Sequence, residues 1–97
     1  MEAAEFASRH ERLLRTLDEL VDLLVAGGDE QWAAWLSGDR RRIAGGDRHG
    51  LDHLLQAYGG MGSFNDVQLR HGDEQLQEMR SLAYEDSAAL RRDLDAS

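Results

Sequence analysis

The chain has 97 residues and a formal net charge of −8, which arises from 19 acidic residues against 11 arginines, with no lysine. Cysteine is absent, which excludes disulfides, thiolate catalysis and cysteine-ligated zinc. The acidic balance argues against direct binding to nucleic acid, because phosphates are bound by clustered positive charge. This length predicts a single domain with one core.

The chain begins with an acidic stretch, Met1-Glu2-Ala3-Ala4-Glu5-Phe6, which has no apolar segment of the kind found in signal peptides. No apolar run approaches the roughly 20 residues that a membrane span needs. We therefore expect a cytoplasmic protein without a membrane segment.

A first helix is predicted over residues 5–26, because apolar residues recur there at helical spacing and Gly27-Gly28 follows them. Asp29 is a good N-cap for a second helix, which Gly45-Gly46 closes. Gly38 lies inside this second helix and predicts a bend or break there.

A short third helix is predicted over residues 47–58 and a fourth over 73–94. Between them, the alternation around Val67 and Leu69 indicates either a brief strand or a turn of helix capped by Ser63. The fold class is therefore expected to be all-α, a single-domain bundle of about four helices over residues 1–97, with a glycine-rich loop between helices three and four.

The fourth helix carries a narrow stripe with several small side chains: Leu76, Met79, Ala83, Ser87, Leu90 and Leu94. Such a stripe predicts either light packing within the chain or contact with a second chain, as in a coiled coil.

The loop after helix three is the least helix-like part of the chain: Gly59, Gly60, Met61, Gly62, Ser63, Phe64, Asn65 and Asp66. It lacks the lysine ending and the preceding strand of a phosphate-binding loop. We expect a tight connector that carries Met61 and Phe64 into the core, while Ser63, Asn65 and Asp66 bind backbone groups.

Asp39 lies on the same side of its predicted helix as Trp32, Leu36 and Ile43, where a carboxylate is unexpected. If buried, it must be paired or hydrogen-bonded. We expect a structural role, such as holding the backbone of the glycine-rich loop. An acid–base group or a cation ligand is the functional alternative.

His49 and His53 are four residues apart, a spacing that places two imidazoles on one helix face, as metal sites need. The string lacks the glutamate of the zinc-protease motif. Both histidines are expected to lie opposite the apolar face and to contact solvent. His10, on the apolar stripe of the first helix, is expected to be a hydrogen-bonded residue at the edge of the core.

Several strings together resemble a small family of uncharacterised bacterial proteins: Gln31-Trp32-Ala33-Ala34-Trp35-Leu36, Asp39, Gly46-Asp47, Leu51-Asp52-His53-Leu54-Leu55 and the glycine-rich loop. The resemblance covers residues 13–69, and the final helix lies outside it. It implies a small bacterial protein that often stands alone. By analogy of size and charge, such proteins include accessory and immunity-type factors that neutralise a toxin.

These observations predict a non-enzymatic, acidic protein-binding module without a cofactor, an immunity or inhibitor-type protein that masks a basic partner. One alternative is a homo-oligomeric structural protein, such as a homodimer, that uses the fourth helix, and another is a metal or small-ligand binding protein. The candidate partner-binding residues are the carboxylates Glu19, Asp22, Asp29, Glu30, Asp73, Glu74 and Glu78.

Overall fold

The computed structural model describes residues 1–59 and 62–96, which form helices joined by short turns and, within these ranges, no β-strand. The elements are α1 (Ala3–Ala26), α2 (Glu30–Ala44), α3 (His49–Gln56), the 3-10 turn η1 (Phe64–Asp66) and α4 (Asp73–Ala96). The expected all-α bundle is confirmed. Because η1 follows Ser63, the segment before Val67 is a turn of helix rather than a strand.

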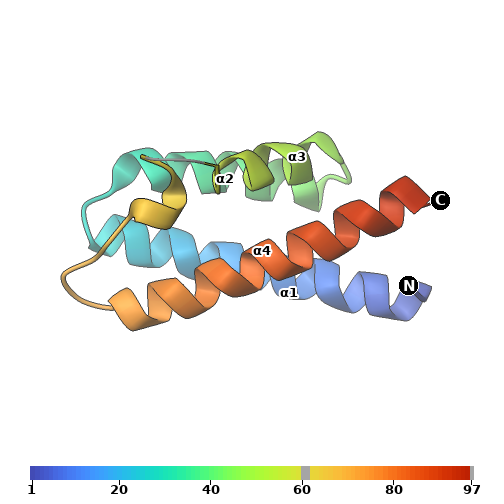
Figure 1. Cartoon of the computed structure of the whole chain (residues 1–97), viewed down its shortest axis with the longest axis horizontal. Coiled ribbons are helices and arrows are strands. Elements are labelled where there is room, and N and C mark those ends of the chain that lie inside the picture. Colours follow the sequence, from blue (N-terminus) through green and yellow to red (C-terminus); the bar gives the residue numbers. More distant parts are fainter. Residues whose placement is uncertain (60–61, 97) are drawn as a thin grey trace.

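The two long helices, α1 and α4, lie side by side and run in opposite directions, while α2 and α3 form a second layer on them (Figure 1). Each helix packs mainly on two others, in the order α1–α2–α3–α4 and back to α1. The principal-axis extents are 41 × 23 × 21 Å, so the bundle has two well-separated ends. One end contains the α1–α2 turn and the start of α4, and the other contains both chain termini (Figure 1).

The helix boundaries follow the signals in the sequence. The side chain of Asp29 accepts a hydrogen bond from the backbone N–H of Trp32 at 3.1 Å and caps α2. Gly28 and Gly46 have φ values of 84° and 81°, which glycine adopts without strain and which turn the chain after α1 and α2. The break that Gly38 allowed is absent, since α2 is a single helix from Glu30 to Ala44.

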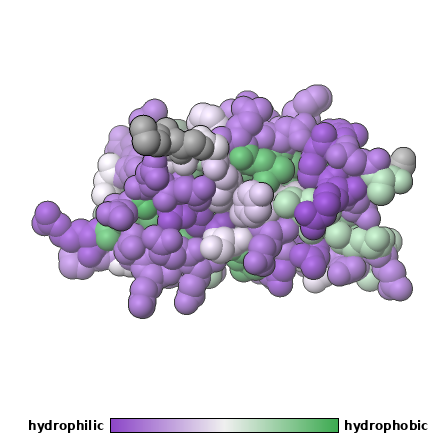
Figure 2. Space-filling view, in the orientation of Figure 1, coloured by the Kyte–Doolittle hydropathy of each residue, from purple (hydrophilic) through white to green (hydrophobic). Residues whose placement is uncertain are grey.

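The core consists mainly of leucine, as six aromatic residues in 97 require. The fully or nearly fully buried leucines are Leu13, Leu17, Leu20, Leu24, Leu36, Leu51, Leu54, Leu69, Leu76 and Leu90. The stripe on α4 is part of this core, because Leu76, Ala83 and Ser87 are buried and α4 packs on α1 and α3. Hydrophilic residues dominate the face that carries α4, and hydrophobic residues appear there only in small, separate areas (Figure 2).

Close packing of α2 against α3 depends on Gly50. A Cβ atom at this position would lie 2.8 Å from the Cβ of Arg42 and 3.1 Å from the backbone N of Ile43. Any larger side chain would push the two helices apart. None of the described helices combines the length and the apolar character needed to cross a membrane.

Candidate functional site

Asp39 is fully buried and joins α2 to α3. Its Oδ1 atom accepts a hydrogen bond from Nδ1 of His53 at 2.5 Å and lies 3.5 Å from Nη1 of Arg42. The His53 ring stacks on Trp35, with ring centroids 4.1 Å apart. The expectation that Asp39 holds the glycine-rich loop needs correction, because its partners among the described residues lie on α2 and α3.

The environment of Asp39 acts on its proton in two opposing ways. Burial raises the pKa of Asp39 above its usual value, because the carboxylate loses hydration, while His53, Arg42 and Trp35 favour the charged form. Within the described part of the chain, Oδ2 of Asp39 and Nε1 of Trp35 are buried without a hydrogen bond of normal geometry. Desolvation therefore has the larger effect on the pKa of Asp39, which links α2 to α3 within the helical layer.

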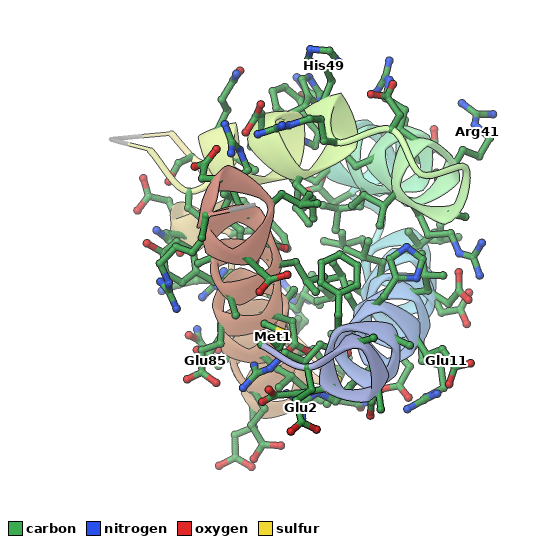
Figure 3. All side chains as sticks on the ribbon, turned by 90° about the vertical axis from the view of Figure 1, so that its right-hand side faces the viewer. Met1, Glu2, Glu11, Arg41, His49 and Glu85 are labelled. Atoms are coloured by element: carbon green, nitrogen blue, oxygen red, sulfur yellow. The ribbon has the colours of Figure 1, made fainter. Side chains whose placement is uncertain are left out.

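The two histidines of α3 have different environments. His49 is highly exposed and points away from the bundle (Figure 3), and its Nδ1 lies 3.0 Å from the carboxylate of Asp47. The expectation of solvent contact is confirmed for His49, whereas His53 is half-buried between Asp39 and Trp35. Among the described residues, no three histidine, aspartate or glutamate side chains come together in a way that could hold a metal ion.

On α1, Nε2 of His10 donates a hydrogen bond to the backbone carbonyl of Ile43 at 2.9 Å. This confirms the expectation of a hydrogen-bonded histidine at the edge of the core.

The polar residues of the glycine-rich loop bind backbone groups, as expected from their types. The Ser63 hydroxyl accepts from the Asn65 N–H at 3.2 Å, and the Asp66 carboxylate accepts from the Gly62 N–H at 2.6 Å. The Asn65 amide donates to the Tyr58 carbonyl at 3.1 Å. These bonds hold the turn to the end of α3.

Phe64 carries this loop into the core. It is fully buried, and its ring lies 5.4 Å from that of Trp32 and 5.7 Å from that of Tyr58. The prediction for Phe64 is confirmed. The matching prediction for Met61, together with the one for Gly60, lies outside the described residues.

Arg80 ties the same loop to α4 and is only 5% exposed. Its Nη1 donates to the carbonyls of Phe64 at 2.8 Å and Val67 at 3.1 Å, and its Nη2 donates to Oε1 of Gln77 at 2.7 Å. The hydroxyl of Tyr58 donates to the Arg80 carbonyl at 2.8 Å. Arg80 therefore organises the contact between the loop and the final helix.

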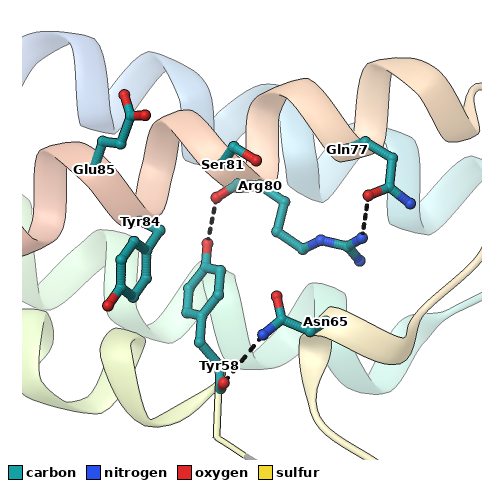
Figure 4. Close-up of a pocket in the computed structure, with 7 residues that line it drawn as sticks. All are labelled: Tyr58, Asn65, Gln77, Arg80, Ser81, Tyr84 and Glu85. Carbon is teal, nitrogen blue, oxygen red and sulfur yellow. Dashed lines mark hydrogen bonds between the residues drawn. The ribbon is translucent and has the colours of Figure 1, made fainter.

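A polar groove of about 550 Å³ opens beside Arg80, between α4 and the segment that follows α3 (Figure 4). Tyr84, which is 47% exposed, stands over it and contacts the Tyr58 ring at 5.1 Å. Burial raises the pKa of Tyr58 above its usual value, so this phenol stays neutral and acts as a donor. The lining residues are Tyr58, Asn65, Gln77, Arg80, Ser81, Tyr84 and Glu85.

The seven candidate partner-binding carboxylates come from three segments that the fold brings to one end of the bundle, shown on the left in Figure 1. This acidic end consists of Glu19 and Asp22 on α1, Asp29 and Glu30 at the start of α2, and Asp73, Glu74 and Glu78 on α4. None of the seven forms an ion pair with a described residue. Asp29 and Asp73 accept hydrogen bonds from the backbone N–H groups of Trp32 and Leu69, so these two also have a local structural role.

Elsewhere in the molecule, several carboxylates pair with arginines. The fully buried Asp86 accepts hydrogen bonds from Arg9 and Arg12, and Arg91 pairs with Asp52 and Asp95. The seven carboxylates of the acidic end are thus a group without ion pairs, although Glu2, Glu11 and Glu85 are exposed and unpaired in other parts of the described surface.

Sequence reasoning missed two buried charged residues, Arg80 and Asp86. Both fall at helical spacing within the α4 stripe, because Arg80 lies four residues after Leu76 and Asp86 lies four before Leu90. The signal was therefore present as two charged side chains on an apolar face.

A family model described as a domain of unknown function (DUF6966) matches residues 25–77, which is more than half of the chain. The match confirms the resemblance to an uncharacterised family. It begins later than expected, at Val25 rather than near Leu13, and it extends beyond Leu69 to Gln77 in α4. No curated protein and no solved structure matches the chain.

Proposed function

We propose that this chain, which belongs to the DUF6966 family of domains of unknown function, is a non-enzymatic module whose acidic end binds a basic surface of another protein. The partner would present clustered arginine or lysine side chains, as the nucleic-acid cleft of a nuclease does. Occupation of such a cleft by the acidic end would block it, which is how an immunity or inhibitor-type protein acts.

The observation that supports this proposal is the gathering of carboxylates from three separate segments at one end of the bundle (Figure 1). Glu30 and Glu74 lie in the first turns of α2 and α4, where the helix dipole favours negative charge. Glu19, Asp22 and Glu78 lie outside any first turn. Helix stability therefore does not account for these three.

The antiparallel packing of α1 and α4 brings part of this charge together. Arg12 on α1 pairs with Asp86 on α4. Glu19 lies seven residues after Arg12 on α1. Met79, the neighbour of Glu78, lies seven residues before Asp86 on α4. Because the helices run in opposite directions, these two carboxylates come to the same level of the bundle. Carboxylates at one level of the bundle add to the negative potential of this end, which suits a basic partner.

The alternative of a homodimer through α4 loses its main support. Its motivation was a stripe of small side chains, and Ala83 and Ser87 in that stripe are fully buried within the chain. The α4 surface that is left outside carries charged and polar groups such as Glu78 and Glu85.

The test is capture of a partner from the native host, using two variants with equal loss of charge. The first is E19Q/D22N/E78Q, which neutralises the acidic end. The second is E2Q/E11Q/E85Q, which removes three exposed carboxylates from other parts of the surface. Figure 3 shows that Glu11 and Glu85 point outward from different sides of the molecule.

The proposal expects the first variant to lose a basic partner that the second still retains. With the purified partner, the association rate of the unmodified protein should fall steeply as salt rises from about 50 mM to about 500 mM. Equal binding by the two variants, or an association rate that does not change with salt, would contradict it. Circular dichroism of both variants checks that they remain folded.

A further inference from the structure

We infer that the groove between α4 and η1 binds a small carboxylate ligand, whose carboxylate pairs with the guanidinium of Arg80. The site is separate from the acidic end in its chemistry, since it offers a positive charge where the rest of the surface is predominantly negative.

The first reason is that the buried Arg80 has no counter-ion among the described residues. The other fully buried charged groups have partners of opposite charge, because Asp39 faces His53 and Arg42, and Asp86 faces two arginines. Arg80 is 5% exposed, yet its acceptors are two backbone carbonyls and one side-chain amide. Within the described ranges it has no carboxylate partner. The guanidinium also lies over the Phe64 ring, 5.5 Å from its centroid, which offsets part of the cost of burying it. A buried cation without a counter-ion is still costly, and an anion in the adjoining groove would lower that cost.

The second reason is the number of donors that Arg80 still offers. A guanidinium carries five N–H groups. Both N–H groups of Nη1 and one of Nη2 are used by Phe64, Val67 and Gln77. The Nε–H and the second Nη2–H have no acceptor among the residues that the structure describes. Carboxylates commonly accept two such bonds from one guanidinium, with a charge-assisted gain in strength.

The third reason is the rest of the lining, which suits a small molecule with a flat apolar body. The rings of Tyr58 and Tyr84 provide aromatic surface, and Asn65 and Ser81 provide neutral hydrogen-bonding groups (Figure 4). The volume of about 550 Å³ lies within the usual range for small-ligand sites.

Glu85 does not oppose a carboxylate at Arg80. It lies five residues further along α4, which is roughly 7.5 Å along the helix axis. The Arg80 side chain extends the other way, toward Gln77 (Figure 4). A ligand can therefore place its carboxylate at Arg80 without meeting Glu85.

The experiment titrates three aromatic probes of similar size into the isotopically labelled full chain: benzoate, benzamide and benzylammonium. Binding is followed through the N–H signals of the backbone and of Arg80 Nε in NMR spectra. Benzoate is expected to saturate and to shift the signals of Arg80, Ser81 and Tyr84. Benzamide should bind roughly tenfold more weakly, because it lacks the charge that Arg80 pairs with. Benzylammonium should not shift these signals.

Three variants separate binding from folding. R80Q should abolish benzoate binding, but it also removes the bonds to the loop. Y84A changes an exposed side chain, so it should leave the fold intact and weaken benzoate several-fold. R92Q, on an exposed part of α4, should leave binding unchanged. The inference is overturned if benzoate does not bind, if benzamide binds equally well, or if R92Q weakens benzoate as much as Y84A does.

Discussion

Replacing Asp86 with alanine removes the carboxylate that holds α1 and α4 together. Asp86 is fully buried and accepts three charge-assisted hydrogen bonds, from Arg9 Nη1 at 3.1 Å, Arg12 Nε at 2.8 Å and Arg12 Nη2 at 2.6 Å. The hydrogen bond from Asp86 is also the main cause that raises the pKa of Arg12 above its usual value. The substitution therefore separates two cations from their shared partner.

The size of the effect depends on how well the two arginines can return to water. Removing one partner of a buried ion pair costs about 3–5 kcal/mol when the other charge stays buried. Here the side chains of Arg9 and Arg12 are 32% and 44% exposed, so rehydration recovers part of that loss and we expect about 2–3 kcal/mol. For a domain of this size, that loss corresponds to a fall in Tm of roughly 10–20 °C.

Guanidinium unfolding followed by far-ultraviolet circular dichroism measures the change in the free energy of unfolding. D95A is the matched control, because Asp95 lies on the same helix and pairs with Arg91 and Arg48 but is 59% exposed. Asp95 is exposed and lies in the last turn of α4, where the helix dipole disfavours a carboxylate, so D95A should cost much less stability than D86A. If D86A were no more destabilising than D95A, the reasoning about the buried pair would be refuted.

The remaining predictions concern Asp39, two glycines and the acidic end. Burial raises the pKa of Asp39, so the folded chain holds the proton on this carboxyl more tightly than the unfolded chain does. The contribution of Asp39 to stability therefore falls as pH rises through its pKa in the folded state. D39N should remove this part of the pH dependence of stability, which urea-unfolding midpoints measured between about pH 4 and pH 8 would show. The same pH profile of midpoints in D39N and the unmodified protein would contradict the prediction. G38A should stabilise α2 by about 1 kcal/mol, because its Cβ would meet nothing closer than 3.6 Å. G50A should destabilise the fold, because its Cβ would lie 2.8 Å from the Cβ of Arg42. Thermal unfolding of the two variants should therefore give changes in Tm of opposite sign. E78Q should raise Tm at low salt by relieving repulsion at the acidic end, and this gain should shrink as salt is added; calorimetry that found a gain independent of salt would exclude repulsion as the cause.

Local signals in the chain were sufficient to predict most of the secondary structure. The cap at Asp29, the glycines after each helix and the spacing of leucines act over one to four residues, so a single sequence contains them in full. The bonds of Ser63 and Asp66 in the loop are of the same short-range kind. The helix does not break at Gly38 because packing of α2 against α1 and α3 outweighs the intrinsic cost of one glycine.

Only the tertiary structure decided which charged groups meet. Asp39 finds His53 14 residues away, and Asp86 finds Arg12 at a separation of 74 residues. Such pairs depend on the order in which helices pack and on their register, and no local pattern encodes either. The sequence by itself determined an acidic four-helix chain with a structured loop. The fold determined that seven of its carboxylates gather at one end, and that Arg80 is buried beside a groove with a positive charge that no described carboxylate neutralises.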